Sequence, residues 1–521
     1  MFKLHQAFVL FCLFFLAQSY ACAGTVLRIN PDKQFQTIEG FGASDCWTVN
    51  YVGQYFSDSE KNKAAQWLFS SKMDKKGQPL GIGLQIWRVN LGAGTLEQGD
   101  SSKIKDITRR AESFLDREGK YDWSKQAGQQ WFIAKAKSHG CKSFVLFSNS
   151  PPLPFTRNGY GFSVGDGNAN LKPECYESFA NYLVDVAVYL SQKHKINIDY
   201  ISPANEPQWP WNGDYQEGSP WQNTELKKMA VELDKALDKQ HFKSTILITE
   251  AAKWDFIYRN DGRASDQIES FYNPQSNLYL GALKHVKPIV GAHSYWTDRS
   301  NDTLVSIRKD AYEKAMKYDL QLHQTEWSML SVPPIDNFPP SYSEACYTDI
   351  ALNMAKVMYA DLAYANVTTW SYWTSMDVEM YGFKNRFNLI RLNTKGDSTS
   401  TIKSGGTVSA MKNLWMLGNY SLFVKPGYKR IEISDAANLN DLMGLSFISP
   451  TKKQIVTVLT NLAKEPNSVT LSLPTSFANR LKSVKAYLTN SSSDLKYSIV
   501  STNSIINLPA RSVTTIVYDF K

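Results

Sequence analysis

The feature that most constrains the fold is a repeated unit in which a short apolar strand leads into a polar or aromatic loop and then an amphipathic helix. Such alternation predicts βαβ units and a parallel sheet. Eight strands follow from Gly40 onward, so the sequence predicts an α/β fold, a (β/α)8 TIM barrel. After the first strand, further strands are predicted at 82–90, 142–148, from 198, and at 245–249, 289–292, 320–326 and 367–373. Helices are predicted at 131–139, 176–193, 225–239, 303–318, 345–365 and 408–417.

The pattern of apolar residues changes near residue 420, where helical periodicity stops. Short alternating strands separated by turn residues follow, at 430–433, 442–448, 454–461, 468–473, 483–489, 504–508 and 512–518. This pattern predicts an all-β sandwich. An alternating strand at 25–38 is expected to join it. We therefore expect a catalytic barrel at 39–419 and a discontinuous sandwich domain made of 24–38 and 420–521.

The first 23 residues have the pattern of a secretion signal. Lys3 precedes an apolar run at 7–17, and small residues end at Ala21-Cys22-Ala23. The apolar run is too short to span a bilayer. We expect cleavage after Ala23 and an exported protein, either secreted or periplasmic. Lipid anchoring through Cys22 is the alternative, which the bulky Tyr20 disfavours.

Composition excludes several other classes of protein. A hydrophobic content of 43% and a charged content of 20% are typical of soluble globular proteins, and no later stretch is apolar enough to cross a membrane. The net charge of +8 is dispersed, so nucleic acid is not an expected partner. The remaining cysteines form no C-x-x-C motif, so a zinc site is not expected. Free buried thiols are favoured over one or two disulfides for these cysteines, which are Cys46, Cys141, Cys175 and Cys346.

Two glutamates at predicted strand ends are the candidate catalytic pair. Glu206 lies in Asn205-Glu206-Pro207, after the strand that starts at 198, and Glu326 ends the strand at 320–326. Working groups of a TIM barrel lie at the C-terminal ends of its strands, so the two carboxyl groups are expected to meet. Residues before proline favour extended backbone, and Pro207 is therefore expected to hold Glu206 at the strand end.

Other polar and aromatic residues fall at the same predicted rim. Arg88 and Tyr295 are expected to hydrogen-bond the carboxylates. His293 is either a ligand contact or a satisfied barrel histidine, and Glu250 is interpreted as a structural partner. Asp45 and Trp47 follow the first strand and either bind a terminal sugar or cap a loop. Candidate stacking platforms for sugar rings, of which one or two are expected to be core, are Trp209, Trp211, Trp221, Trp296 and Trp373.

An ordered set of motifs resembles glycoside hydrolase family 30. The set is Gly40-Phe41-Gly42, Trp87-Arg88-Val89, Asn205-Glu206-Pro207, His293-x-Tyr295, Thr325-Glu326 and Leu508-Pro509-Ala510-x-Ser512-Val513. The resemblance covers nearly all of the mature chain and implies a retaining β-glycosidase. It implies Glu206 as acid/base, Glu326 as nucleophile and Asn205 as a contact to the sugar 2-hydroxyl.

Within the family, Pro207-Gln208-Trp209 and the segment 216–221 are most similar to the endo-β-1,6-galactanase branch. One departure is the family's frequent tryptophan after the third strand, which is replaced here around Ser148-Asn149-Ser150.

The expected reaction is a double displacement without cofactor or metal, in which Glu326 attacks the anomeric carbon and Glu206 transfers the proton. The lead substrate is β-1,6-galactan, with xylan and β-1,6-glucan as alternatives. A sugar-binding protein that has lost catalysis is the alternative of another class, and the presence of both glutamates disfavours it. The sequence leaves endo or exo action and the oligomeric state open.

Overall fold

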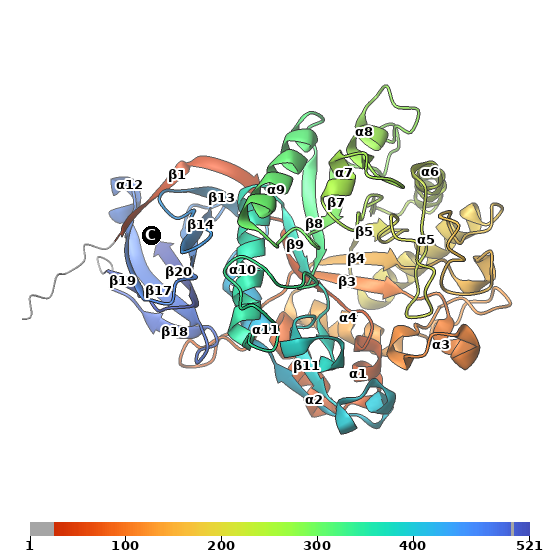
Figure 1. Cartoon of the computed structure of the whole chain (residues 1–521), viewed down its shortest axis with the longest axis horizontal. Helices are drawn as coiled ribbons and strands as arrows, with labels where there is room; N and C mark the ends of the chain where they lie inside the picture. Colours follow the sequence, from red (N-terminus) through yellow and green to blue (C-terminus); the bar gives the residue numbers. More distant parts are fainter. Residues whose placement is uncertain (1–24, 502–504) are drawn as a thin grey trace, which may run out of the picture.

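A computed structural model describes residues 25–501 and 505–521. The predicted signal peptide lies outside the described residues. Eight parallel strands form a curled sheet in the order β6-β5-β4-β3-β2-β9-β8-β7, and a parallel bridge between Ala251 and Ala292 joins its two ends (Figure 1). The predicted TIM barrel is therefore confirmed. Its strands are β2 (Gly40–Ser44), β3 (Ile86–Leu91), β4 (Ser143–Ser148), β5 (Ile198–Ser202), β6 (Thr245–Ile246), β7 (Ile289–His293), β8 (Gln321–Trp327) and β9 (Thr369–Tyr372).

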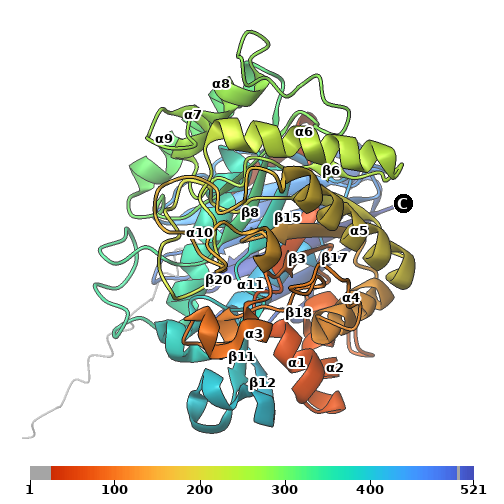
Figure 2. The ribbon, with the colours of Figure 1, turned by 90° about the vertical axis from the view of Figure 1, so that its right-hand side faces the viewer.

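Helices cover the outside of the barrel, and Figure 2 shows α4, α5 and α6 along one side of it. The barrel helices are α1 (Val49–Tyr55), α2 (Asp58–Phe69), α3 (Thr95–Gln98), α4 (Ala127–His139), α5 (Tyr176–His194), α6 (Asn223–Lys239), α7 (Asp255–Tyr258), α8 (Gln267–Tyr272), α9 (Asn301–Met316), α10 (Tyr347–Ala363) and α11 (Lys412–Ser421). Capping side chains mark the first turns of two helices. Ser300 accepts a hydrogen bond from the Thr303 amide at the start of α9, and Glu225 accepts one from the Gln222 amide at the start of α6.

A small three-stranded sheet is inserted between β9 and α11. It consists of β10 (Met376–Asp377), β11 (Ile390–Asn393) and β12 (Thr407–Ala410). The helix predicted at 408–417 is therefore wrong in its first part, because 407–410 pairs with β11 and the helix begins only at Lys412. This insertion matters for the site because β10 carries Asp377 to the rim of the barrel.

The described C-terminal strands form one mixed sheet in the order β18-β17-β20-β15-β14-β13-β1-β16-β19, which Figure 1 shows beside the barrel. The sheet encloses an apolar core of its own, as predicted for a β-sandwich. Strand β1 belongs to it, because its first residues run parallel to β16 and its later ones antiparallel to β13. The strands are β1 (Thr25–Thr37), β13 (Lys429–Ile433), β14 (Leu442–Ile448), β15 (Gln454–Asn461), β16 (Asn467–Ser472), β17 (Leu481–Thr489), β18 (Lys496–Ile499), β19 (Ile506–Leu508) and β20 (Ser512–Phe520), with the short helix α12 (Thr475–Ala478).

The barrel and the sandwich share a buried interface. Along β15, Ile455 and Leu459 pack into the sandwich core, whereas Val456 and Val458 belong to the large cluster that includes the barrel. Helix α10 is buried nearly all round because it contacts β14, β15 and β20 as well as the barrel helices. Helix α11 also packs against both parts, so the boundary near residue 419 stays a proposal: barrel at 39–419, sandwich at 24–38 and 420–521.

Within 25–501 and 505–521, the four cysteines are free thiols. Cys46 and Cys141 are buried, Cys175 is half-buried and Cys346 is exposed, so the expectation of buried thiols is met by two of them. None of the helices in this part of the chain combines the length and apolar character that a membrane span requires.

Candidate active site

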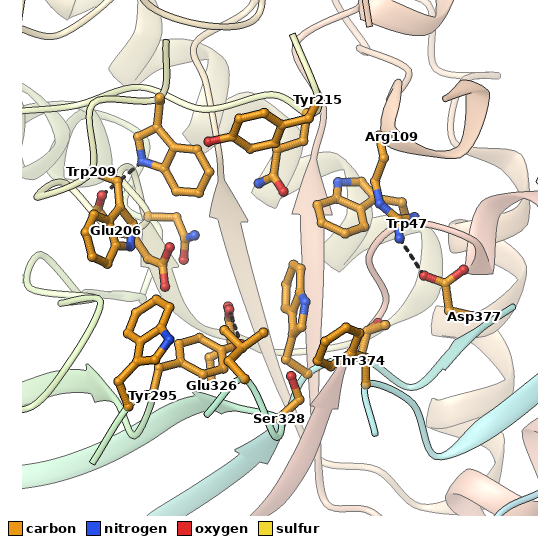
Figure 3. Close-up of a pocket in the computed structure, with 17 residues that line it drawn as sticks. Trp47, Arg109, Glu206, Trp209, Tyr215, Tyr295, Glu326, Ser328, Thr374 and Asp377 are labelled. Atoms are coloured by element: carbon orange, nitrogen blue, oxygen red, sulfur yellow. Dashed lines mark hydrogen bonds and ion pairs between the residues drawn. The ribbon is translucent and has the colours of Figure 1, made fainter. Parts of the chain in front are cut away.

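The structure brings the two predicted carboxyl groups together at the C-terminal rim of the barrel. Glu206 follows β5, Glu326 lies on β8, and both line one cleft of about 500 Å³ (Figure 3). One carboxylate oxygen of each glutamate and a ring nitrogen of His293 all lie within 4.8 Å of one another. Both glutamate side chains are more than nine-tenths buried, so their charges are poorly screened by water.

The backbone at Glu206 differs from the extended conformation predicted from Pro207. Its φ is +46°, on the left-handed side, and its amide donates to the Glu250 carbonyl oxygen at 3.0 Å. A non-glycine residue in this region carries a cost on the order of 1–2 kcal/mol, and such residues concentrate at functional sites. The carbonyl oxygen of Glu206 accepts from the Trp211 indole at 3.0 Å, which fixes the turn.

Glu326 is held by two donors. Arg88 Nη1 donates to Oε2 at 2.8 Å, and the Tyr295 hydroxyl donates to Oε1 at 2.8 Å. Arg88 also donates through Nη2 to Asn205 Oδ1 at 2.7 Å and to Glu250 at 3.0 Å. Its guanidinium lies 3.6 Å from the centre of the Phe147 ring, and the Arg88 side chain is buried. The predicted roles of Arg88 and Tyr295 as hydrogen-bond donors agree with this geometry.

His293 lies beneath the carboxyl groups and does not line the cleft. Its Nδ1 is 2.8 Å from Glu206 Oε1 and its Nε2 is 3.1 Å from Glu250 Oε2. Burial lowers the pKa of His293, but the surrounding glutamates outweigh burial and raise it to about 10. His293 is therefore a cation at neutral pH that positions Glu206. Of the two roles considered for it, the geometry fits the satisfied barrel histidine and not the substrate contact.

The two glutamates that hydrogen-bond to His293 have pKa values shifted in opposite directions. Burial raises the pKa of Glu206, and repulsion from Glu326 adds to this rise, while His293 opposes it. Burial also acts on Glu250, but Arg88 and His293 outweigh it and lower the pKa of Glu250. Glu250 is completely buried and also accepts from Thr325 at 3.2 Å, so it is the structural anion expected from the sequence.

Asp45 is completely buried and does not line the cleft, so of its two expected roles the structural one fits and the contact to a terminal sugar does not. Its Oδ1 accepts from the Asn90 amide at 2.9 Å, and its Oδ2 accepts from the Gln129 side chain at 2.8 Å. Burial raises the pKa of Asp45 to about 7. Asn149, in the segment that departs from the family pattern, donates to Asn90 Oδ1 at 3.2 Å in the same buried layer.

Five of the candidate aromatic residues line the cleft: Trp47, Trp209, Trp211, Trp296 and Trp373. Four of them form two edge-to-face pairs, Trp47 with Trp373 at 5.0 Å and Trp209 with Trp296 at 5.3 Å between ring centres. Trp221 is completely buried, so it belongs to the core as expected for one or two of the set. The cleft therefore has an aromatic pair on each side of the carboxylates.

Several cleft residues were not predicted. Arg109 and Asp377 form an ion pair of 2.8 Å at the side of the cleft away from Glu206, as Figure 3 shows. Tyr215 and Gln216 come from the connection between β5 and α6, and further lining residues are Ser328, Leu330, Thr374 and Phe387. Arg109 and Asp377 lie in segments far apart in the sequence, so no local sequence pattern indicates that they pair. Tyr215, by contrast, lies within the tryptophan- and proline-rich segment that follows Glu206.

Among the described residues, Glu206, His293 and Glu326 are close enough to act as a set of metal ligands. The same three groups already hydrogen-bond to one another or to the Arg88 guanidinium. Arg88 and the protonated His293 place two positive charges at this point, which disfavours a further cation. Glu206, His293 and Glu326 are therefore better suited to hydrogen bonds and ion pairs with one another and with Arg88 than to binding a metal ion.

A (β/α)8 barrel with two facing carboxyl groups in an aromatic cleft defines a glycoside hydrolase. Comparison with known families gives the same class: the profile described as O-glycosyl hydrolase family 30 matches residues 24–387. The chain belongs to this family.

One curated relative and two solved structures define the similarity. An endo-β-1,6-galactanase of Hypocrea rufa is 29% identical over 204 residues, which are 37% of this chain and 41% of the relative. The crystal structure of a conserved exported protein from Bacteroides fragilis is 31% identical, with a TM-score of 0.87, covering 95% of this chain and all of that one. The catalytic domain of a family 30 xylanase from Talaromyces cellulolyticus has a TM-score of 0.67 at 20% identity, covering 95% of this chain and 99% of that one, and shows the same fold.

Proposed function

We propose that the chain is a retaining β-glycoside hydrolase in which Glu326 is the nucleophile and Glu206 the acid/base. The observation that carries this proposal is the distance between the two carboxyl groups, which have oxygens within 4.8 Å of each other. Retaining enzymes separate their carboxyl groups by about 5 Å, whereas inverting enzymes need a wider gap of about 6.5–9.5 Å to admit water.

In the first step the Glu326 carboxylate attacks the anomeric carbon while Glu206 protonates the leaving oxygen. Glu206 Oε1 accepts a hydrogen bond from His293, so the transferable proton is carried by Oε2. Burial raises the pKa of Glu206 and keeps this proton on the free enzyme. In the second step Glu206, now a carboxylate, takes a proton from water, which releases the sugar from Glu326.

Neighbouring side chains orient the nucleophile and the sugar. Arg88 and Tyr295 donate to the two oxygens of Glu326 and fix the direction of its attack. Asn205 lines the cleft and its Oδ1 accepts from Arg88, which leaves its NH2 group to donate to the sugar 2-hydroxyl. Such contacts strengthen in the transition state and contribute several kcal/mol.

The lead substrate is β-1,6-galactan. Support comes from the sequence similarity to the Hypocrea rufa endo-β-1,6-galactanase, although the matched segment spans only 41% of that protein. We further propose that the protein is exported, which the signal-like first 23 residues and the similarity to the Bacteroides fragilis exported protein support. The partner of the site is thus an extracellular β-linked glycan.

A screen of polysaccharides tests this proposal. The purified protein is incubated with β-1,6-galactan, β-1,6-glucan and xylan, and reducing sugar is measured. We expect release from β-1,6-galactan and loss of about 10³-fold or more in kcat for Glu326→Gln, with an unchanged circular dichroism spectrum. Full activity of Glu326→Gln would reject the nucleophile, and release from xylan alone would reject the substrate.

A further inference from the structure

The position of the catalytic acid gives the cleft a direction. Under the proposed function, Glu206 protonates the leaving oxygen, so the leaving-group side of the substrate lies beside Glu206. Trp209 and Trp296 line that side of the cleft. The sugar that becomes bonded to Glu326, the glycone, therefore extends the other way. Figure 3 shows Trp47, Arg109 and Asp377 on that opposite side.

Arg109 and Asp377 form a buried ion pair in the wall of the cleft. Arg109 Nη2 lies 2.8 Å from Asp377 Oδ2, and the two residues are 7% and 3% exposed. The Arg109 guanidinium lies 4.3 Å from the centre of the Trp47 ring, and Asp377 Oδ1 accepts from the Val378 amide at 2.8 Å. The leaving-group side is more open, since Trp296 is 37% exposed and Tyr215 57%.

A pair of this kind is better explained by ligand recognition than by stability. Taking two charges out of water costs several kcal/mol per ion, and well-packed apolar residues often give an equal or more stable protein. Binding clefts, by contrast, use a few fixed polar groups to orient a ligand. A guanidinium supplies only donors and a carboxylate only acceptors, so together they match sugar hydroxyl groups, which donate and accept.

We propose that Arg109 and Asp377 form a specificity-determining pair that binds hydroxyl groups of the glycone sugar. The inference rests on the proposed function for the direction of the cleft. The pair distinguishes sugars by the orientation of their hydroxyl groups, because a site built to bind a hydroxyl leaves buried polar groups unpaired when that hydroxyl is missing or misplaced. Galactose and glucose differ in this way at C4, and xylose lacks the C6 hydroxymethyl group.

The first test measures discrimination in hydrolysis. Wild type, Asp377→Asn and Arg109→Lys are assayed on β-1,6-galactan, β-1,6-glucan and xylan. We expect kcat/KM for the best substrate to fall by about 10- to 100-fold and kcat/KM for the other two to fall much less. The ratio of kcat/KM on the best substrate to kcat/KM on each of the others therefore decreases. A purely structural role would lower all three values equally and leave the ratio unchanged.

The matched control is Glu379→Gln. Glu379 lies two positions from Asp377 and pairs with Arg391 at 2.7 Å, but it does not line the cleft. We expect this variant to keep the wild-type ratio. The inference would be overturned if the ratio of kcat/KM values between substrates stayed unchanged in both Asp377→Asn and Arg109→Lys, or if it decreased equally in Glu379→Gln.

The second test separates this inference from the proposed function. In a Glu326→Gln background, binding of β-1,6-linked galacto- and gluco-oligosaccharides and of xylo-oligosaccharides is measured by calorimetry with and without Asp377→Asn. Weaker discrimination with Asp377→Asn supports the pair even if the wild-type protein cleaves none of the glycans, an outcome that would refute only the proposed function. Equal affinity for all three oligosaccharides, or no binding of any of them, would overturn the proposed role of Arg109 and Asp377.

Discussion

Replacement of His293 by asparagine tests which groups set the pKa of Glu206, the proposed acid/base. His293 lies 2.8 Å from Glu206 and 3.1 Å from Glu250, and its raised pKa of about 10 makes it a cation at neutral pH. The asparagine side chain retains a donor near Nδ1 but carries no charge. Glu250 stays paired with Arg88 and Thr325, so we expect the variant to fold.

The direction of the effect follows from the groups around Glu206. Burial raises the pKa of Glu206 and the hydrogen bond and charge of His293 lower it, so removing the charge raises this pKa further. An opposite charge at such short range shifts a carboxyl pKa by about 1–3 units. In the proposed mechanism activity depends on protonated Glu206, so the alkaline limb of the kcat/KM profile is expected to move to higher pH by about 1–3 units.

The assay is kcat/KM on the best glycan substrate from about pH 4 to about pH 10, a range that covers carboxyl and imidazole titrations. His323→Asn is the matched control, because His323 is also a buried barrel histidine on β8 and lies 3.5 Å from Glu39 outside the cleft. The control should keep the wild-type alkaline limb. A limb that stays in place in His293→Asn, or moves to lower pH, would refute the assigned electrostatics.

Three further predictions concern the acid, the buried histidine and the helix packing. Glu206→Gln should lower kcat on polysaccharide by about 10²- to 10⁴-fold but spare the first step on an aryl glycoside with a good leaving group, as burst kinetics would reveal. In the folded protein the pKa of His293 is about 10, above the ordinary histidine value of about 6.5, so its contribution to the free energy of unfolding is complete below about pH 6.5 and is lost as pH rises to about 10. Urea melts of wild type and His293→Asn should therefore converge over that window, and a constant difference would contradict this. Gly128→Ala should lower the free energy of unfolding by at least about 1–3 kcal/mol, because the added Cβ would lie 1.9 Å from the Asn50 carbonyl oxygen, whereas Ala134→Ser on the exposed face of α4 should have little effect.

The residues that sequence reasoning found share one property: they lie at or just after the ends of parallel strands. In a closed barrel all these ends meet at one rim, so Arg88, Glu206 and Glu326 are brought together by the fold class alone. The fold was predictable for the same reason, since strand–helix alternation is a local pattern with one common solution. The shift to alternating strands near residue 420 likewise marked the sandwich.

The direction of a side chain at a strand end was not predictable. Asp45 and His293 both lie at the rim, yet both point into buried hydrogen-bond layers beneath the cleft. The left-handed backbone at Glu206 also runs against the local preference imposed by Pro207, because contacts with Glu250 and Trp211 outweigh it.

Residues contributed by irregular segments were missed because tertiary contacts alone place them. Arg109 ends a 3₁₀ turn (Ile107–Arg109) in the connection between β3 and α4, and Asp377 lies on the two-residue strand β10. The partner strand of β10 is β11, and β12 pairs with β11 through backbone groups that leave no trace in local periodicity. Loop geometry therefore sets the walls of the cleft, while the barrel sets its chemistry.

Double displacement by Glu326 and Glu206 across a narrow gap fixes the anomer that is released first. Proton NMR of the sugar released from the β-glycan, recorded before mutarotation, identifies that anomer. Two inversions at the anomeric carbon predict that the β-anomer appears first and the α-anomer grows in later. Initial release of the α-anomer would contradict double displacement, because it would require a water molecule to attack where the structure places the Glu326 carboxylate.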